Sequence, residues 1–431
     1  MSHRFSTNSI GNVARIVAAS LGLAAVPFVS SAMAQTSLSM WYHGSGNQAE
    51  SAVVNQIIDD FNKSQSDWAV KLQSFPTGAY NDAVVAGALA GSLPDILDVD
   101  GPNMPNWAWA GYMQPLSIDQ DAVKNFLPGT KGIWDGKLYS VGLFDATISL
   151  VSRKSILDQL GLRLPTLDKP WTKDEFMAAL KAAKTSGKYS FALDLATQNN
   201  SGGWYAYGYT PLLWSFGGDL VDRKTYLTAE GALNGEGAMA FGDWFQGLFK
   251  DGYAEADQAQ ADREAGFAKG RYAFSWQGSG TALRALEAFN DTVFLPAPDF
   301  GHGAKVGAGS WQFGASKSSK HPDGVAAFIK FALQDKYLAA FSDATGLIPA
   351  TPSAAAQTKN FREGGPLAQF FEFSNRQGMV RPITPGFAVQ AVVFRKAMGD
   401  IAHGANVADT LDAAVDEINA DIERNRGYGH K

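Results

Sequence analysis

The sequence predicts an α/β protein of two domains, in which each domain is a mostly parallel sheet flanked by helices. Short apolar strands alternate with amphipathic helices, and this order produces parallel strand–helix–strand units. The chain has 431 residues, which is more than one hydrophobic core usually serves. Near its middle, two extended runs, Lys137–Leu143 and Thr147–Ser152, follow one another almost directly, and we expect the chain to cross between the domains there.

The first 34 residues are predicted to be a cleavable secretory signal peptide. Arg4 and Arg15 are followed by the apolar run Ile16–Val29, and Ala32-Met33-Ala34 fits the small-x-small cleavage pattern, so we expect cleavage after Ala34. The apolar run is too short and too rich in Ala and Ser to be a good membrane span. The mature chain is therefore expected to be exported and soluble.

Composition excludes several classes of function. The formal net charge is −6, and loss of Arg4 and Arg15 with the signal lowers it to −8, which argues against nucleic acid or an anionic membrane as a partner. The chain has no cysteine, so disulfides, thiolate metal sites and a lipid-modified N-terminal cysteine are excluded. We expect neither a cofactor nor a bound metal.

The first predicted strand, Leu38–Tyr42, runs into a glycine-rich turn and then into a helix with apolar residues from Val54 to Phe61 at helical spacing. Backbone N–H groups at the start of such a helix can meet a ligand. The amides of Asn47 and Gln48 are therefore candidates for binding hydroxyl groups.

The same turn matches the dinucleotide pattern G-x-G-x-x-A through Gly44, Gly46 and Ala49. We reject this interpretation, because the next predicted strand, Trp68–Phe75, ends without the acidic residue that binds a ribose. His43 is interpreted as a structural residue rather than a metal ligand.

Carboxylates stand at two strand ends. Asp100 follows the predicted strand Ile96–Val99, and ligands of parallel sheets collect beyond the carboxyl ends of strands. At the crossing, Phe144 and Asp145 place an aromatic face beside a carboxylate, which suits a polar ligand in a cleft between domains. A turn aspartate before Gly101 and an ordinary paired strand remain the alternatives.

Aromatic residues gather among glycines after the crossing, in Trp204–Tyr209 and again in Trp214–Asp219. This is a poor pattern for a hydrophobic core. Flat rings beside backbone that can be approached closely suit the apolar faces of a sugar, so Trp204 and Trp214 are candidate ligand contacts. In contrast, the apolar spacing from Phe241 to Leu248 predicts the core face of a helix.

The later elements follow from spacing and turn chemistry. A capping box at Thr172-x-x-Glu175 opens a helix, and Arg271–Trp276 is a predicted strand. Val306–Phe313 again places glycines, including Gly309, before a tryptophan, Trp311. We expect further helices at 322–333 and 411–422, a loose return linker at 352–365, and a constrained turn at 381–386 that holds Arg381.

Five stretches in this order resemble one known family: Gly87–Ile96 leading to Ala110–Leu116, the crossing Leu138–Ile156, Phe267–Phe274, Trp311–Lys330 and Thr345–Pro349. Together they are similar to the bacterial extracellular solute-binding proteins of family 1, the maltose-binding-like sugar receptors of ABC importers. The resemblance covers nearly all of the mature chain.

The resemblance implies the two-lobed periplasmic binding protein fold, with lobes joined by crossover strands and a sugar held in the cleft between them. The first lobe would be 36–145 plus 312–368, and the second 148–310 plus 372–431. It implies a periplasmic monomer without catalytic activity that delivers a saccharide to ABC permease transmembrane subunits. The aromatic clusters favour an oligosaccharide or a glycoside.

The resemblance also implies a set of cleft residues. These are Asn47, Asp100, Asp145, Trp276 as a stacking wall, Trp311, and Arg381 as a cation directed at hydroxyls. This chain departs from some relatives, which have Glu in the first turn where Asn47 or Gln48 stands, and it has Ser275–Gly278 in place of a Gly-Ser-Trp sequence.

Two other classes of protein are weighed against a sugar receptor. A receptor for a polyol, polyamine or other non-sugar solute would use nearly the same groups, although few basic residues fall at the predicted cleft, which disfavours an anionic ligand. An exported glycan-active enzyme would need two carboxylates that flank the scissile bond at a defined separation. Asp100 and Asp145 could be such a pair, but no accompanying pattern marks them as one.

Overall fold

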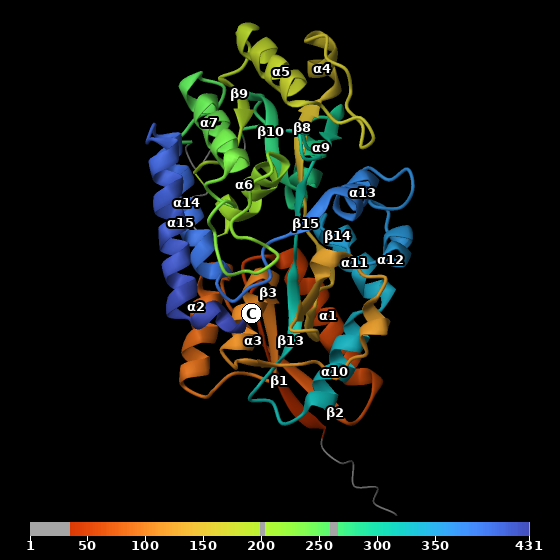
Figure 1. Cartoon of the computed structure of the whole chain (residues 1–431). Helices are drawn as coiled ribbons and strands as arrows, with labels where there is room; N and C mark the ends of the chain where they lie inside the picture. The colour runs from red at the N-terminus through yellow and green to blue at the C-terminus, as the bar shows by residue number, and fades with distance from the viewer. Residues whose placement is uncertain (1–34, 199–202, 259–265, 431) are drawn as a thin grey trace, which may run out of the picture. The chain divides into compact units, whose positions relative to one another are not determined.

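The computed structural model of the protein describes residues 35–198, 203–258 and 266–430 (Figure 1). The predicted signal peptide lies outside the described residues. Three parallel strands begin the first sheet: β1 (Thr36–Tyr42) lies between β2 (Trp68–Ser74) and β3 (Ile96–Asp100). Helices α1 (Gln48–Ser64) and α2 (Thr77–Leu89) connect them, as the strand–helix–strand order predicts.

The rest of this sheet is antiparallel. β13 (Trp311–Ser316) inserts between β3 and β6 (Lys137–Val141), β5 (Lys131–Trp134) forms the edge, and β4 (Met113–Gln114) pairs with β13. The sheet is thus mixed and not mostly parallel as expected, because β13 brings the chain back from the second sheet. Asp135 and Gly136, both with positive φ, form the two-residue turn between β5 and β6, as Asp-Gly favours.

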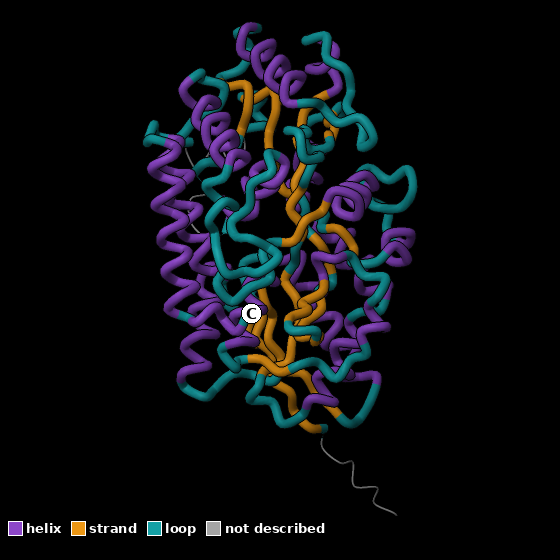
Figure 2. The backbone as a smooth tube through the Cα atoms, viewed as in Figure 1, coloured by secondary structure: helices purple, strands orange, loops and turns teal. Residues whose placement is uncertain are grey.

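The second sheet has the order β11-β8-β10-β9. β10 (Tyr272–Gly278) is parallel to β9 (Phe191–Asp194), whereas β8 (Ile148–Arg153) is antiparallel to both β10 and β11 (Thr292–Leu295). Its inner strands are buried almost throughout. In Figure 2 the orange strands gather in an upper and a lower group that orange segments connect, and helices lie outside them.

Two short strand pairs mark where the chain passes between the sheets. β7 (Phe144–Asp145) pairs with β14 (Ile348–Pro349), and β12 (Val306–Ala308) pairs with β15 (Gly378–Val380). A single bridge joins Ala146 to Gly309. Both crossing segments, β7–β8 and β12–β13, are therefore hydrogen-bonded to each other, and the predicted crossing lies within this region.

Helices cover both sheets. Packed with the first sheet or close to it are α3 (Met104–Trp109), α10 (Pro322–Ala332), α11 (Asp335–Thr345) and α12 (Pro352–Gln357). The others are α4 (Lys154–Gln159), α5 (Lys173–Thr185), α6 (Trp204–Ser215), α7 (Glu236–Lys250), α9 (Ala282–Ala288), α13 (Ala368–Gln377), α14 (Phe387–Ala402) and α15 (Val407–Arg424). Short 3-10 turns are η1 (Gly101–Asn103), η2 (Gln120–Val123), η3 (Pro128–Thr130), η4 (Ser279–Thr281) and η5 (Arg426–Gly429).

Separate hydrophobic cores support the two sheets. One core joins β1, α1, α10 and α11, and another joins the second sheet to α5, α6, α7, α14 and α15. The predicted core face of α7, from Phe241 to Leu248, is confirmed, since Phe241, Phe245 and Leu248 are each 0% exposed. The capping box of Thr172 and Glu175 is also confirmed. Among the described residues, no helix is long and apolar enough to cross a membrane.

Two expectations about local structure are wrong. The stretch Trp204–Tyr209 was expected to be a poor pattern for a hydrophobic core. It is the start of α6, and Tyr205 and Tyr209 are buried on its core side. Its glycine, Gly208, allows close packing beneath the Trp204 ring, which an added Cβ would approach to 3.0 Å. The stretch 352–365 is not a loose linker, because α12 buries Ala354 and Ala355 and the chain then buries Phe361.

Candidate functional site

A cavity of about 640 Å³ opens at the carboxyl ends of β9 and β10, the place where parallel strands usually meet a ligand. It lies beside the crossing, because Ala146 belongs to its wall. Its lining combines aromatic rings, polar side chains and exposed backbone: Ala146, Asp194, Ala196, Trp204, Tyr207, Trp276, Gln277, Gly278, Ser279, Gly280, Thr281 and Arg284.

Three aromatic side chains give the cavity its flat walls. Trp204 and Tyr207 stand one turn apart on α6, with ring centroids 6.0 Å apart and planes at 64°. The indole of Trp276 donates to the carbonyl of Gly208 at 2.7 Å, and that of Trp204 donates to the carbonyl of Leu195 at 3.2 Å. Because both indole N–H groups are occupied, the rings can offer a ligand apolar surface but no hydrogen bonds. Trp276 is 2% exposed, so the half-buried Trp204 and Tyr207 supply most of that surface.

The polar wall is built on Asp194 at the end of β9, a residue that the sequence analysis missed. Asp194 is 3% exposed and accepts hydrogen bonds from Ser275 Oγ at 2.6 Å and Gln258 Nε2 at 2.9 Å. Burial raises the pKa of Asp194, and these hydrogen bonds oppose that rise. Asp194 follows a buried strand, and the same position made Asp100 a candidate ligand contact.

Gln277 is held on this polar base. Its Nε2 donates to Ser275 Oγ, and its Oε1 accepts from the hydroxyl of Thr281 at 2.8 Å. The chain Asp194–Ser275–Gln277–Thr281 therefore fixes an amide and a hydroxyl at the cavity wall. Such groups bind the hydroxyls of a polar ligand, and their fixed geometry limits which hydroxyls fit.

Asp145, at the crossing, binds the protein's own donors. It is 0% exposed and accepts from the backbone N–H groups of Gly309 at 2.7 Å and Ala146 at 2.9 Å, and from the hydroxyl of Ser374. Burial raises the pKa of Asp145, and these three bonds with the charge of Arg381 lower it. The carboxylate thus ties β7, the β12–β13 connection and α13 together. Phe144 lies in the core, stacked on Phe341 at 4.9 Å and 8°.

Gly309 and Arg381 lie against each other beside this tie. Gly309 has φ 155°, and a Cβ there would lie 2.4 Å from Nη2 of Arg381, so a side chain would displace the guanidinium. The guanidinium carbon lies 5.0 Å from the centroid of the Tyr207 ring. Nε of Arg381 has no hydrogen-bond partner among the described residues. The cation therefore spans from the crossing to the aromatic cavity wall.

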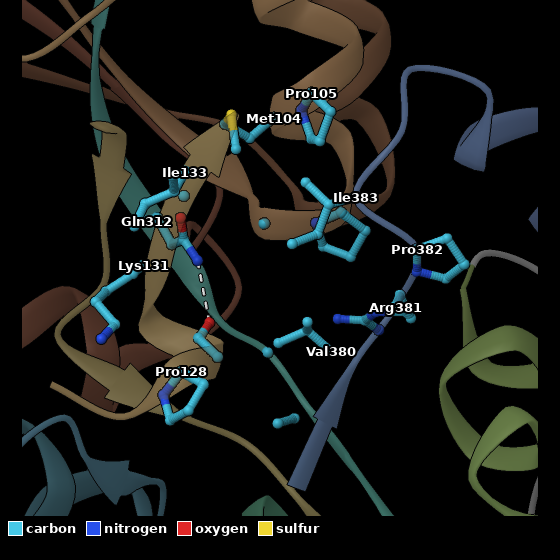
Figure 3. A pocket seen from close by; sticks show the side chains of 16 residues that line it. Met104, Pro105, Pro128, Lys131, Ile133, Gln312, Val380, Arg381, Pro382 and Ile383 are labelled. Carbon is cyan, nitrogen blue, oxygen red and sulfur yellow. Dashed lines mark hydrogen bonds between the residues drawn. The ribbon is translucent and has the colours of Figure 1, made fainter. Parts of the chain in front are cut away.

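A second, smaller cavity of about 60 Å³ is lined in part by Arg381 (Figure 3). Lys131 and Ile133 of β5, Met104 of α3 and Ile383 contribute to its wall. The dashed line in Figure 3 is the 3.0 Å hydrogen bond from Gln312 Nε2 to the carbonyl of Gly129. This cavity is large enough for water and too small for a sugar ring.

Asp100 and Trp311 face each other in register at the ends of β3 and β13. Asp100 is half-buried, and no hydrogen bond from another described residue reaches its carboxylate. Burial raises the pKa of Asp100, whereas the charges of Arg381 and His43 lower it. Trp311 is half-buried and lies parallel to the ring of His43, with centroids 3.7 Å apart.

Of the predicted contacts, Trp204 and Trp276 alone are among the described residues that line the large cavity. Asn47 caps α1 by accepting from the N–H of Glu50 at 3.3 Å, and Gln48 is the exposed first residue of that helix. Trp214 is buried at the other end of α6, where its indole donates to Asp219 at 2.8 Å and Arg223 covers its ring. Trp204 and Trp214 are ten positions apart, so α6 carries them to different surroundings.

Two mixed sheets joined by paired crossing strands, with a cavity at the crossing, define the two-lobed class of binding proteins. Residues 56–365 match the family model described as bacterial extracellular solute-binding protein. The match covers more than half of the chain, and the chain therefore belongs to this family. It is a family of receptors that bind solutes and not a family of enzymes.

The chain is similar to several known proteins. It is 28% identical over 274 residues to the diacetylchitobiose binding protein DasA of Streptomyces coelicolor, covering 59% of this chain and 60% of that protein. It is 26% identical to the sn-glycerol-3-phosphate-binding periplasmic protein UgpB of Brucella melitensis, covering 80% of this chain and 82% of that protein. The crystal structure of the cyclic alpha-maltosyl-1,6-maltose binding protein of Arthrobacter globiformis has a TM-score of 0.76 at 23% identity, covering 90% of this chain and 100% of that one. This last likeness confirms the two-lobed fold.

Proposed function

We propose that the protein is the substrate-binding component of an ABC sugar importer, which captures an oligosaccharide or a glycoside and delivers it to a membrane permease. The observation that carries the proposal is the cavity at the crossing, where Trp204, Tyr207 and Trp276 stand beside Gln277 and Thr281. Its volume of about 640 Å³ lies within the range of roughly 300–1,000 Å³ usual for ligand sites.

The chemistry of the cavity suits a saccharide. Sugar rings have apolar faces that pack on aromatic rings and hydroxyl edges that bind amides, hydroxyls and charged groups. Among the described residues, no hydrogen bond reaches the Asp100 carboxylate, and the Nε–H of Arg381 is buried without a partner; bonds from such charged groups to hydroxyls are stronger than neutral ones. We propose Trp204, Trp276, Trp311, Asp100 and Arg381 as ligand contacts.

We further propose the lobe boundaries 36–145 plus 312–368 and 148–310 plus 372–431. On this division Asp100 and Trp311 stand on the first lobe or its edge, and Trp204 and Trp276 on the second. A ligand that touches both would favour the closed arrangement by its differential affinity, and a permease can recognise that arrangement. Asp145 and Gly309 would then hold the joint and not the ligand.

We also propose that the protein acts as a monomer in the periplasm after cleavage behind Ala34. The family is extracellular by its description, and the N-terminal sequence has the three parts of a secretory signal. N-terminal sequencing of the protein from a periplasmic fraction is expected to begin at Gln35, and light scattering is expected to give the mass of one chain.

Catalysis is not part of the proposal. Asp145 and Asp194 are the most buried carboxylates near the cavity, and the protein's own donors already occupy them. The lining of the cavity, as far as the structure describes it, contains one carboxylate, that of Asp194, and Asp100 is not part of it. A glycosidase would need two such groups across the bond.

A phosphorylated polyol is the second candidate ligand, favoured by one observation. Arg284 lines the cavity, and no described residue pairs with it. Its guanidinium group can bind phosphate, and a second one, that of Arg381, lies 5.0 Å from the ring of Tyr207 in the cavity wall. The low basic content of the predicted cleft had disfavoured an anion, but Arg284 was not foreseen there. A protein similar to this chain binds sn-glycerol-3-phosphate by name.

The two candidates are separated by thermal melting and tryptophan fluorescence of the mature protein. Maltotriose, diacetylchitobiose, sn-glycerol-3-phosphate and inorganic phosphate would each be added, since a ligand of the native state raises the melting temperature by mass action. A shift with a saccharide supports the main proposal, and a shift with glycerol phosphate alone supports the second. Trp204→Ala should abolish the shift, whereas the control Trp109→Ala, at a 41% exposed residue outside the cavity, should keep it.

A further inference from the structure

A buried histidine lies directly behind the ring of Trp311. His43 is 4% exposed, and its imidazole is parallel to the indole, with ring centroids 3.7 Å apart and planes at 7°. Tyr80 meets the same indole edge-on at 5.6 Å and 77°. Trp311 is itself only half-buried. His43 therefore covers one face of the indole, and the exposed part of the ring is what a ligand can reach.

His43 is held on all sides. Asp98 accepts a hydrogen bond from Nδ1 and another from the backbone N–H at 3.3 Å. On the other edge, Nε2 lies 3.8 Å from Oε2 of Glu50. The hydroxyl of Thr77 donates to the His43 carbonyl at 3.2 Å. Both ring nitrogens are directed at carboxylates, so the plane of the imidazole is fixed. The stacked indole lies parallel to that plane.

The surroundings favour the charged form of His43. Asp98 and Asp100 face it from β3 and Glu50 from α1, with the rings of Tyr42 and Tyr80 around them. In the described part of the chain, no lysine or arginine pairs with Asp98 or Glu50. Burial by itself lowers the pKa of His43, but the charge and hydrogen bond of Asp98, with the charges of Glu50 and Asp100, raise it above 6.5.

A metal does not explain the cluster, because the described residues contain no group of three or more His, Asp and Glu side chains that could hold one. We propose that His43 is a positioning residue of the ligand site, whose ring stacks on Trp311, is anchored by Asp98 and Glu50, and sets the orientation in which Trp311 meets a ligand. The inference rests on the proposed function, because Trp311 is one of its proposed contacts.

The stack has a signature that needs no ligand. A protonated imidazole in contact with an indole quenches its fluorescence, so Trp311 should be dark while His43 is charged and should brighten as pH rises through the raised pKa of His43, above 6.5. A purely structural histidine elsewhere in the core would not change this emission.

The first experiment is a pH titration of tryptophan emission from pH 5 to 10 without ligand. The difference in emission between the wild type and Trp311→Phe should show a step above pH 6.5. This step should be absent in His43→Gln. The matched control is His321→Gln. The ring of His321 lies beside that of Trp68, with centroids 5.5 Å apart and planes at 56°, and Trp68 is at the start of β2, away from the strand ends of the site. The proposal is overturned if His43→Gln keeps the step or if Trp311→Phe does not remove it.

A second variant guards against a misfolded His43→Gln protein. Glu50→Gln keeps the ring and removes one of the carboxylates that raise the pKa of His43, so the emission step should move to lower pH. An unmoved step in a folded Glu50→Gln protein would show that the charge of Glu50 does not act on the ring, and it would overturn the anchoring by Glu50.

The binding measurement uses whichever of maltotriose, diacetylchitobiose or sn-glycerol-3-phosphate binds the wild type. Without the stack, Trp311 is free to leave the orientation that meets a ligand, so His43→Gln should weaken binding on the order of tenfold, and its affinity should change less with pH than that of the wild type. Equal affinity and an equal pH profile in wild type and His43→Gln would overturn the proposal while leaving a saccharide receptor intact. If none of these probes binds, the proposed function and the role of His43 both fail.

Discussion

Removal of Asp145 tests whether hydrogen bonds at the crossing hold the molecule together. In Asp145→Ala, the N–H groups of Gly309 and Ala146 and the hydroxyl of Ser374 lose their acceptor in a site that is 0% exposed. A buried hydrogen bond to a charged group contributes about 1.5–3 kcal/mol, and the relief of burying a carboxylate offsets part of the sum. We expect a net loss of about 4 kcal/mol in the free energy of unfolding.

Asp145→Asn is the matched control. Its carbonyl oxygen can still accept from both backbone N–H groups, and its amide can donate to the Ser374 oxygen, so the loss should stay within about 1 kcal/mol. Ser374→Ala removes one of the bonds and should fall between the two. Urea unfolding followed by tryptophan fluorescence measures all three. If Asp145→Ala and Asp145→Asn lose the same free energy, the hydrogen bonds are not what Asp145 contributes and the reasoning is refuted.

Three further predictions follow from local features. Gly237→Ala should destabilise the protein by about 2 kcal/mol or more, since its Cβ would lie 2.5 Å from the carbonyl oxygen of Phe216. In the same helix, the Cβ of Gly247→Ala would meet nothing within 4 Å, and this variant should be more stable by roughly 0.5–1 kcal/mol in the same urea assay. Hydrogen bonds from Arg163 lower the pKa of Glu175 from 4.5 to about 2, so the stability that Glu175 contributes is complete above pH 4.5 and is lost as pH falls towards 2. Glu175→Gln should therefore reduce the fall of the melting temperature in that pH range. An unchanged fall of the melting temperature would contradict this. Trp204→Phe should weaken saccharide binding by about tenfold, from the lost ring area at the cavity wall and the lost bond to Leu195, whereas Trp214→Phe, outside the cavity, should not, as titration calorimetry would show.

Sequence patterns predicted the parts of the fold that depend on local periodicity. The apolar spacing of α1 and α7, the capping box at Thr172, and the segments near Lys137 and Thr147 all appear in the structure. The mixed character of the sheets was not predicted, because strand direction depends on which distant segment pairs with which. β13 joins β3 although their sequences lie far apart.

Candidate site residues were harder to predict, because residue type does not reveal which way a side chain faces. Trp204 and Trp214 share one helix and one local composition, yet one lines the cavity and the other is covered by Arg223. Asp145 was placed at the crossing from its neighbours in sequence. Its partners Gly309 and Ser374 are remote, so sequence alone could not show that the carboxylate is already occupied.

The bond between Ala146 and Gly309 has a mechanical consequence. The two strands that pass between the sheets are not independent tethers, because this bridge and the Asp145 carboxylate fasten one to the other. Any rotation of one sheet against the other would have to bend both strands at the same place and by the same angle. Sideways sliding would break the fastening, so the joint would allow a single axis of rotation, and small-angle scattering with and without ligand would record two shapes rather than a continuum.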